Sequence, residues 1–297
     1  MKLEDITAEI RPRTNFEAVD LGWALTRENY GKILRAWMIG VWPIWAIFLV
    51  LFRDNLFWAV FFIWLLKPFY DRVPLFFLSR ALFGATPTVG ALLKQWFPMM
   101  FRNFWHGIFI GRFSPWRHLV LPIRELEKLK GDAYWRRGSA LTARAAGAAW
   151  WTQIGIIAMV HATWIGIVAT ISWLIPQQIR PELMTHLGNV VSFNFDLVPY
   201  HAWWVFILLY LGALTIFEPF VVGGGFGLYL NARSHLEGWD IELAFRRLSA
   251  RLLEQMATIA IAAVVLLGAT SGFAQDDAPP APKGPDDTIG DIMDLSL

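Results

Sequence analysis

"AWWVFILLYLGALTIFEPFVVGGGFGLYL", residues 202–230, contains a single charged side chain, Glu218, in 29 residues. A helix crosses the hydrocarbon core of a bilayer with about 20 mostly apolar residues, and this run exceeds that length. The complete chain has the same character, because 56% of its 297 residues are hydrophobic and only 17% are charged. Soluble domains carry about 25% charged residues. We therefore predict an all-α integral membrane protein.

Four further apolar runs bring the prediction to about five transmembrane helices. They cover residues 37–52, 56–66, 145–175 and 256–273. The first two are separated by only three polar residues, so residues 37–66 are predicted to form a transmembrane hairpin. The third and fourth spans lie within residues 145–230 and are joined by an external loop, residues 176–201.

Lysine and arginine are distributed unequally between the two sides that this map defines. Residues 1–36 hold six of them, residues 67–146 hold thirteen and residues 231–255 hold four. The opposite side holds only three of the 26 basic residues. Because the cytoplasmic loops of membrane proteins carry the excess of Lys and Arg, we expect the N-terminus inside and the C-terminus outside.

The segments between the spans differ in composition. Residues 1–36 form a mixed-charge cytoplasmic segment, and residues 67–144 alternate short apolar clusters with single basic residues. This alternation is typical of amphipathic helices lying in the headgroup layer, so the second segment is predicted to be interfacial and cytoplasmic. After the fifth span, residues 274–297 are rich in Asp and Pro, a composition that favours a flexible external tail.

Several classes of chemistry find no support. The chain has no cysteine and a net charge of only +2, so disulfides and thiolate metal sites are excluded, and nucleic-acid binding is not expected. Catalytic triads and the usual metal-binding motifs do not occur. We expect no cofactor and no metal. An intramembrane enzyme is the least favoured hypothesis, because the sequence lacks paired catalytic groups.

Two ionisable residues lie within predicted spans, where such residues are costly and mark candidate functional sites. Glu218 precedes Pro219, which removes one helical hydrogen bond, so this position is a candidate for binding a proton or cation. The alternative is a glutamate that only packs helices, because the run offers it no partner of opposite charge. His161, in "AMVHATW", is the weaker candidate and is expected to make one interhelical hydrogen bond. The glycines of "VVGGGFG", residues 221–227, favour close helix–helix packing.

The segment 231–255, here called the elbow, is predicted to be a cytoplasmic amphipathic helix after a turn. Gly238 is placed to end the preceding helix, and Asp240 to cap the next one. Apolar residues of the elbow share one helical face, whereas its charged residues lie on the others. The segment is a plain surface helix, a surface that docks a partner, or an intramolecular clamp. The candidate docking residues are Arg233, Glu237, Asp240, Glu242, Arg246 and Arg247.

Four separated stretches carry a resemblance to a known family. They are "FEAVDLGWALTRENYGKILRAW" (residues 16–37), "WLLKPFYDRVPLFFLSRALFG" (64–84), "SPWRHLVLPIRELEKLKG" (114–131) and "FGLYLNARSHLEGWDIELAFRRL" (226–248). Together they resemble uncharacterised bacterial multi-pass inner-membrane proteins. The genes of that family tend to lie beside those of a MoxR-type AAA+ ATPase, von Willebrand-like proteins and a transglutaminase-like membrane protein.

The resemblance implies a component of an ATPase-linked envelope or complex-assembly system in the bacterial inner membrane. We therefore hypothesise a non-enzymatic scaffold in the lipid bilayer. Its basic cytoplasmic face would dock a soluble partner such as the ATPase, and its acidic tail would contact an envelope protein. The alternative hypothesis is a transporter or proton-coupled subunit that uses Glu218.

Overall fold

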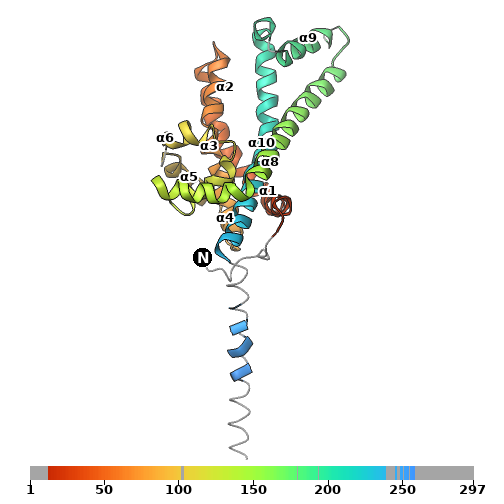
Figure 1. Ribbon diagram of the computed structural model, residues 1–297. Coiled ribbons are helices and arrows are strands. Elements are labelled where there is room, and N and C mark those ends of the chain that lie inside the picture. Colours follow the sequence, from red (N-terminus) through yellow and green to blue (C-terminus); the bar gives the residue numbers. More distant parts are fainter. Residues whose placement is uncertain are drawn as a thin grey trace, which may run out of the picture. The chain divides into compact units, whose positions relative to one another are not determined.

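The computed structural model describes residues 13–101, 104–178, 180–192 and 194–238, together with residues 245, 248–249, 251–253 and 255–257. The chain divides into two compact units, Met1–Ile241 and Glu242–Leu297. All helices named below belong to the first unit (Figure 1).

The described part of the chain is helical, and no strand occurs in it. Its elements are α1 (Asn15–Leu51), α2 (Leu56–Leu65), α3 (Lys67–Tyr70), α4 (Arg72–Ala81), α5 (Val89–Phe101), α6 (Phe104–His106), the π-helical turn η2 (Gly107–Gly111), α7 (Arg117–Glu125), α8 (Gly131–Leu174), α9 (Arg180–Val191), the 3-10 turn η3 (Phe195–Leu197) and α10 (Tyr200–Glu237). The predicted all-α class is therefore confirmed over these residues.

Three helices, α1, α8 and α10, are long and apolar enough to cross a membrane. They contain three of the five predicted spans. The predicted span at residues 56–66 corresponds to α2, which has only 10 residues and is shorter than the usual span. The fifth, residues 256–273, lies almost entirely outside the described residues. The structure thus supports a membrane protein with three candidate spans.

The long helices extend beyond the apolar runs that predicted them. α1 begins at Asn15, where the Thr14 hydroxyl accepts a hydrogen bond from the Glu17 amide at 3.3 Å. α8 begins at Gly131, and α10 ends at Glu237. The predicted boundaries at residues 36, 144 and 230 therefore fall inside helices. Hydropathy marks where charged residues begin, whereas a helix ends where its backbone hydrogen bonds end.

Gly238 terminates α10, as the sequence predicts. It adopts a left-handed conformation with φ 61°, and its amide donates to the Ser234 carbonyl at 3.0 Å. Glycine is the residue that takes this conformation without a steric penalty. The end of the helix is thus set by one backbone position rather than by a change in polarity.

The segment after α2 is partly buried within the protein. Every residue of α4 from Arg72 to Ser79 is buried, and the helix packs against α1, α5 and α10. Its one buried cation is neutralised there, because Arg72 pairs with Glu125 at 3.1 Å. The placement of the segment in the headgroup layer stays a prediction. Further along, Trp105 and Phe109 are exposed, as an interfacial segment requires.

The central packing is that of α1 against α10 and depends on small residues. A Cβ atom added to Gly227 would lie 2.1 Å from the Ala18 carbonyl oxygen, and one added to Gly223 would lie 2.0 Å from the Thr26 hydroxyl. No side chain fits at either position. The prediction that "VVGGGFG" mediates close helix contact is therefore confirmed.

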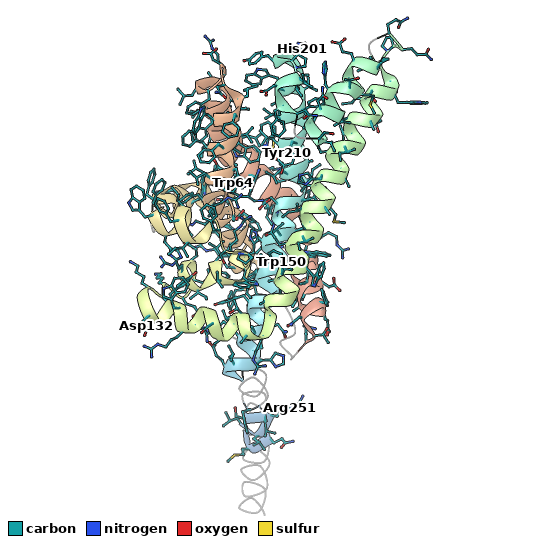
Figure 2. The ribbon with its side chains drawn as sticks, turned by 45° about the horizontal axis from the view of Figure 1, so that its top comes forward. Trp64, Asp132, Trp150, His201, Tyr210 and Arg251 are labelled. Atoms are coloured by element: carbon teal, nitrogen blue, oxygen red, sulfur yellow. The ribbon has the colours of Figure 1, made fainter. Side chains whose placement is uncertain are left out.

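α8 follows two directions. In Figure 2 the part between Asp132 and Trp150 crosses the molecule, and the remainder rises beside α10. Along this second part the Trp164 indole donates to the Phe206 carbonyl of α10 at 3.0 Å. The two helices therefore enclose one side of the space described next.

Candidate functional site

A cavity of about 800 Å³ lies among α1, α2, α8 and α10. Trp64, Trp150 and Tyr210 line it from α2, α8 and α10 respectively (Figure 2). Most of its remaining wall is aromatic or aliphatic, with contributions from Trp164, Trp203, Phe206 and Ile207 among others. The cavity is therefore predominantly apolar and rich in tryptophan.

One face of α10 forms a continuous wall of this cavity. Its lining residues recur at helical spacing, namely Trp203, Ile207, Leu211, Leu214 and Glu218. At a rise of 1.5 Å per residue this wall extends for about 22 Å. It is apolar from Trp203 to Leu214 and ends on a carboxylate. The cavity thus has a polarity gradient along its length.

The polar end of the cavity adjoins a buried group of ionisable side chains. This Glu218 cluster consists of Lys67, Asp71, Arg117, His118 and Glu218. The Lys67 ammonium lies 2.7 Å from Glu218 Oε2, and Arg117 Nη2 lies 3.9 Å from Glu218 Oε1. Arg117 Nε also lies 3.1 Å from Asp71 Oδ2. Two cations therefore contact two carboxylates away from water.

The partner of Glu218 overturns one inference from the sequence. We expected a glutamate with no matching charge, because the span around it contains no basic residue. Lys67 approaches it from the start of α3, and Arg117 from the start of α7. A charge far away in the chain becomes the partner only through tertiary packing.

The local environment shifts the protonation of His118 and Asp71. Burial lowers the pKa of His118 well below its usual 6.5, and the nearby cations Arg117 and Lys67 act in the same direction. Burial raises the pKa of Asp71 from 3.8 to about 7, although Arg117 opposes this change. His118 is consequently neutral at pH 7, and the charge of Asp71 is sensitive to pH near neutrality.

Asp71, His118 and Glu218 place one potential metal-ligand atom each within 4.8 Å of one another. The surrounding charges do not favour a metal ion there. Lys67 and Arg117 already contact both carboxylates, so a divalent cation would have to displace them or remain beside two positive charges in a buried site. We interpret this group as an internal ion cluster.

Arg112, which follows η2, adds a third cation to the cavity wall. Its guanidinium carbon lies 3.7 Å from the centre of the Trp64 ring. Within the described residues no carboxylate lies within 4.0 Å of it, and its Nε is buried without a hydrogen-bond acceptor. The polar end of the cavity therefore contains a cation held by an aromatic ring and not by an acid.

His161 lines the cavity but does not link two helices by a hydrogen bond. Its Nδ1 lies 2.8 Å from the Ile157 carbonyl of the same helix, and its ring meets Tyr210 edge-on at 5.5 Å. The side chain is exposed. The expected interhelical contact is thus an aromatic one.

Two of the predicted docking residues belong to a second ion group. This elbow cluster consists of Glu127, Arg137, Tyr229, Arg233 and Glu237. Arg233 Nη2 lies 2.7 Å from Glu237 Oε2, and Arg137, which also contacts Glu237, lies 3.1 Å from Glu127 Oε2. The Tyr229 hydroxyl donates to Glu127 at 2.7 Å. The charges of Arg233 and Glu237 are therefore used within the protein.

The other four docking candidates cannot be placed. Asp240, Glu242, Arg246 and Arg247 lie outside the described residues. The prediction of a docking surface there stays a prediction.

Sequence reasoning missed Lys67, Asp71, Arg112 and Arg117 as site residues. Each lies at the end of an apolar run beside proline or aromatic residues, in "LLKPFYDR" or "GRFSPWRH". A charge that stays close to a span end is a weak signal on its own, since basic residues are common there.

Comparisons with known proteins returned no counterpart. No family model matches the chain, and neither a curated protein nor a solved structure does.

Proposed function

We propose that this protein is a non-enzymatic integral membrane subunit that binds an amphipathic ligand in the cavity between α2, α8 and α10. The apolar part of the ligand lies along the wall from Trp203 to Leu214, and its polar part lies at the Glu218 cluster. The observation that carries this proposal is the polarity gradient of the cavity.

The dimensions and chemistry of the cavity support the proposal. Ligand sites usually have volumes of about 300–1,000 Å³ and combine apolar walls with a few polar groups, and the volume here is about 800 Å³. The apolar part of the α10 wall, from Trp203 to Leu214, extends for about 16 Å, which is longer than a compact metabolite needs. An elongated hydrocarbon chain uses that length.

The distribution of charge supports a placement in the bacterial inner membrane. With the basic segments inside, the N-terminus is cytoplasmic, and Lys67, Arg112 and Arg117 belong to the basic side. The polar end of the cavity then lies toward the cytoplasmic leaflet, and the Trp203 end toward the outer one. An amphiphile of that leaflet enters with its head group near the charges.

Filling the cavity tests the proposal. Leu214 lines the cavity, whereas Ile216, two residues further along α10, is exposed. Leu214→Trp should abolish binding of a brominated single-chain amphiphile, and Ile216→Trp should leave it unchanged. Binding is measured by quenching of intrinsic tryptophan fluorescence in purified protein. Thermal unfolding in the same detergent verifies that both variants remain folded.

Equal quenching of the two variants would show that the amphiphile binds elsewhere, for example on the lipid-facing surface. Loss of quenching in both would have the same meaning. Either result removes the cavity as the ligand site.

Docking of a cytoplasmic protein is the second candidate function. Phe245, Leu248 and Leu252 are exposed and are separated by three and four residues, the spacing of one helical face. This stripe is the remaining support for the scaffold hypothesis, with a MoxR-type AAA+ ATPase as the partner. Charge reversal of Arg246 and Arg247 should disrupt co-purification with the purified ATPase. Retention of the ATPase by the charge-reversed protein would remove this candidate.

A further inference from the structure

The polar end of the cavity has more positive than negative side chains. Lys67, Arg112 and Arg117 line it together with a single carboxylate, Glu218. Asp71, which pairs with Arg117 just behind the wall, is the second acid of the group. Above pH 7, where both acids are ionised, the three cations leave an excess of one positive charge.

Arg112 carries that excess. Lys67 and Arg117 each contact a carboxylate at 3.1 Å or less. Among the described residues, the partner of Arg112 is the face of Trp64, at 3.7 Å, and its buried Nε has no acceptor there. A cation on an aromatic ring still has its N–H donors available in the plane of the guanidinium. Because Arg112 lines the cavity while its Nε is buried, its terminal amino groups are the donors available to an anion there.

The guanidinium geometry indicates the type of anion. Arginine presents a planar set of donors that matches two oxygens of a phosphate or carboxylate group. A phosphodiester and a carboxylate each carry one negative charge and two such oxygens, which corresponds to the single excess charge, and the phosphodiester is the anionic group of bilayer lipids. A second negative charge on the ligand would remain uncompensated beside Glu218.

We infer that the polar end of the cavity binds a phosphodiester head group carried on an apolar chain, with Arg112 as its principal contact. This inference depends on the proposed function and names the ligand class of the same site. Arg112 holds the phosphate oxygens, while Lys67 and Arg117 stay paired with Glu218 and Asp71 and add a positive field. The chain follows the α10 wall toward Trp203.

The test compares head groups on identical chains. The purified full-length protein in neutral detergent is titrated with brominated phosphatidylglycerol, phosphatidylcholine and diacylglycerol, and tryptophan quenching is measured. Phosphatidylglycerol, whose phosphodiester charge is not compensated within its own head group, should bind about tenfold more tightly than zwitterionic phosphatidylcholine and uncharged diacylglycerol, the gain expected from a hydrogen-bonded charge pair. Arg112→Gln should remove this preference, Arg112→Lys should retain part of it, and the binding of diacylglycerol should be unchanged in both.

Arg53→Gln is the matched control, because Arg53 is exposed at the opposite end of the α1–α2 pair and does not line the cavity. It should leave the preference intact. If Arg112→Gln keeps the wild-type preference, the inference is wrong. The same conclusion follows if a carboxylate amphiphile of equal chain length binds as well as the phosphodiester.

Inorganic phosphate identifies the source of the anion. It should compete only weakly, because it lacks the chain that fills the apolar wall. Competition at the affinity of the lipid would overturn the inference in favour of a free-phosphate site. Failure of this inference is distinguishable from failure of the proposed function: in the first case Leu214→Trp still abolishes binding of all three lipids, and in the second it has no effect.

Discussion

The Glu218 cluster and the elbow cluster are built from the same residue types and differ in what surrounds them. In the elbow cluster, Glu127 and Glu237 receive donors from two arginines and a tyrosine, and the side chains remain partly exposed. In the Glu218 cluster, the carboxylate oxygens of Glu218 and Asp71 are buried, and their contacts are to cations: Lys67 lies 2.7 Å from Glu218, and Arg117 lies 3.1 Å from Asp71.

The difference distinguishes an ion group that connects helices, the elbow cluster, from one that borders a binding site, the Glu218 cluster. Charges that are paired and partly hydrated contribute little to the free energy of folding, in either direction, when they connect helix ends. Burying charged groups costs free energy. The position of the Glu218 cluster next to the cavity is a functional reason for that cost. The elbow cluster joins α8, the end of α10 and the chain after α7, whereas the Glu218 cluster gives the cavity its polar end.

Removing Glu218 should have the largest effect on stability. Glu218→Ala leaves Lys67 without its nearest acid in a buried site, and breaking one partner of a buried pair costs about 3–5 kcal/mol. Chemical unfolding of the purified protein in detergent measures this loss. A loss below about 1 kcal/mol, the value of an exposed pair, would show that the two clusters contribute equally to stability.

Replacing both Lys67 and Glu218 by neutral residues further tests how the Glu218 cluster differs from the elbow cluster. In the Lys67→Met, Glu218→Met double variant no charge of this pair is left uncompensated, and such replacements are often neutral or stabilising by about 1–4 kcal/mol. We expect the double variant to be more stable than Glu218→Ala in the same unfolding assay. A double variant as unstable as the single one would mean that Glu218 stabilises the fold mainly through Arg117.

Gly225 offers a way to move the Glu218 cluster without changing a charge. A Cβ atom at this position would lie 2.5 Å from His118 Cβ and 2.8 Å from the His118 carbonyl oxygen, so α7 must shift and take Arg117 with it. Gly225→Ala should cost about 1–3 kcal/mol through overpacking and weaken amphiphile binding. Both quantities come from the unfolding and quenching assays.

Gly212→Ala is the control on the same helix, because nothing lies within 4 Å of its added Cβ. It should be neutral or stabilise by about 1 kcal/mol, the helix preference of alanine over glycine. A similar loss in both variants would point to the helix itself and not to the contact with α7.

The pH dependence of stability should differ between wild type and Asp71→Asn. Burial raises the pKa of Asp71 to about 7 in the folded protein, above its ordinary 3.8, so the folded state binds this proton more tightly than the unfolded state. Its contribution to stability is complete below pH 3.8 and is lost as the pH rises through about 7. Unfolding curves across this range should therefore show a slope that Asp71→Asn reduces. An unchanged slope would assign it to another group.

Changes in the elbow cluster should have the smallest effect. Glu237→Ala removes contacts to Arg233 and Arg137, but exposed and half-exposed pairs contribute only about 0.2–1 kcal/mol. The loss should shrink further in 1 M salt, where charges are screened beyond about 3 Å. A loss comparable to that of Glu218→Ala would show that the two clusters are energetically alike.

Composition and the local sequence pattern predicted part of the fold. Apolar runs located α1, α8 and α10, Gly238 marked the end of α10, and the glycines near residue 224 indicated close packing. The boundaries at residues 36, 144 and 230 were misplaced, because a helix continues through charged residues when its backbone bonds continue. The burial of α4 was also missed. Arg72 is expected at the surface unless it has a buried partner, and the sequence does not identify Glu125 as that partner.

The sequence by itself determined that this chain is helical and apolar enough for a membrane, and it singled out Glu218 as the costly charge. Only the tertiary structure decided what that charge means. Lys67 and Arg117 come from distant segments and contact Glu218, and Arg112 lines the same tryptophan-rich cavity. Hydropathy and helical spacing are local properties, whereas the partner of a buried charge depends on which distant segments pack against it.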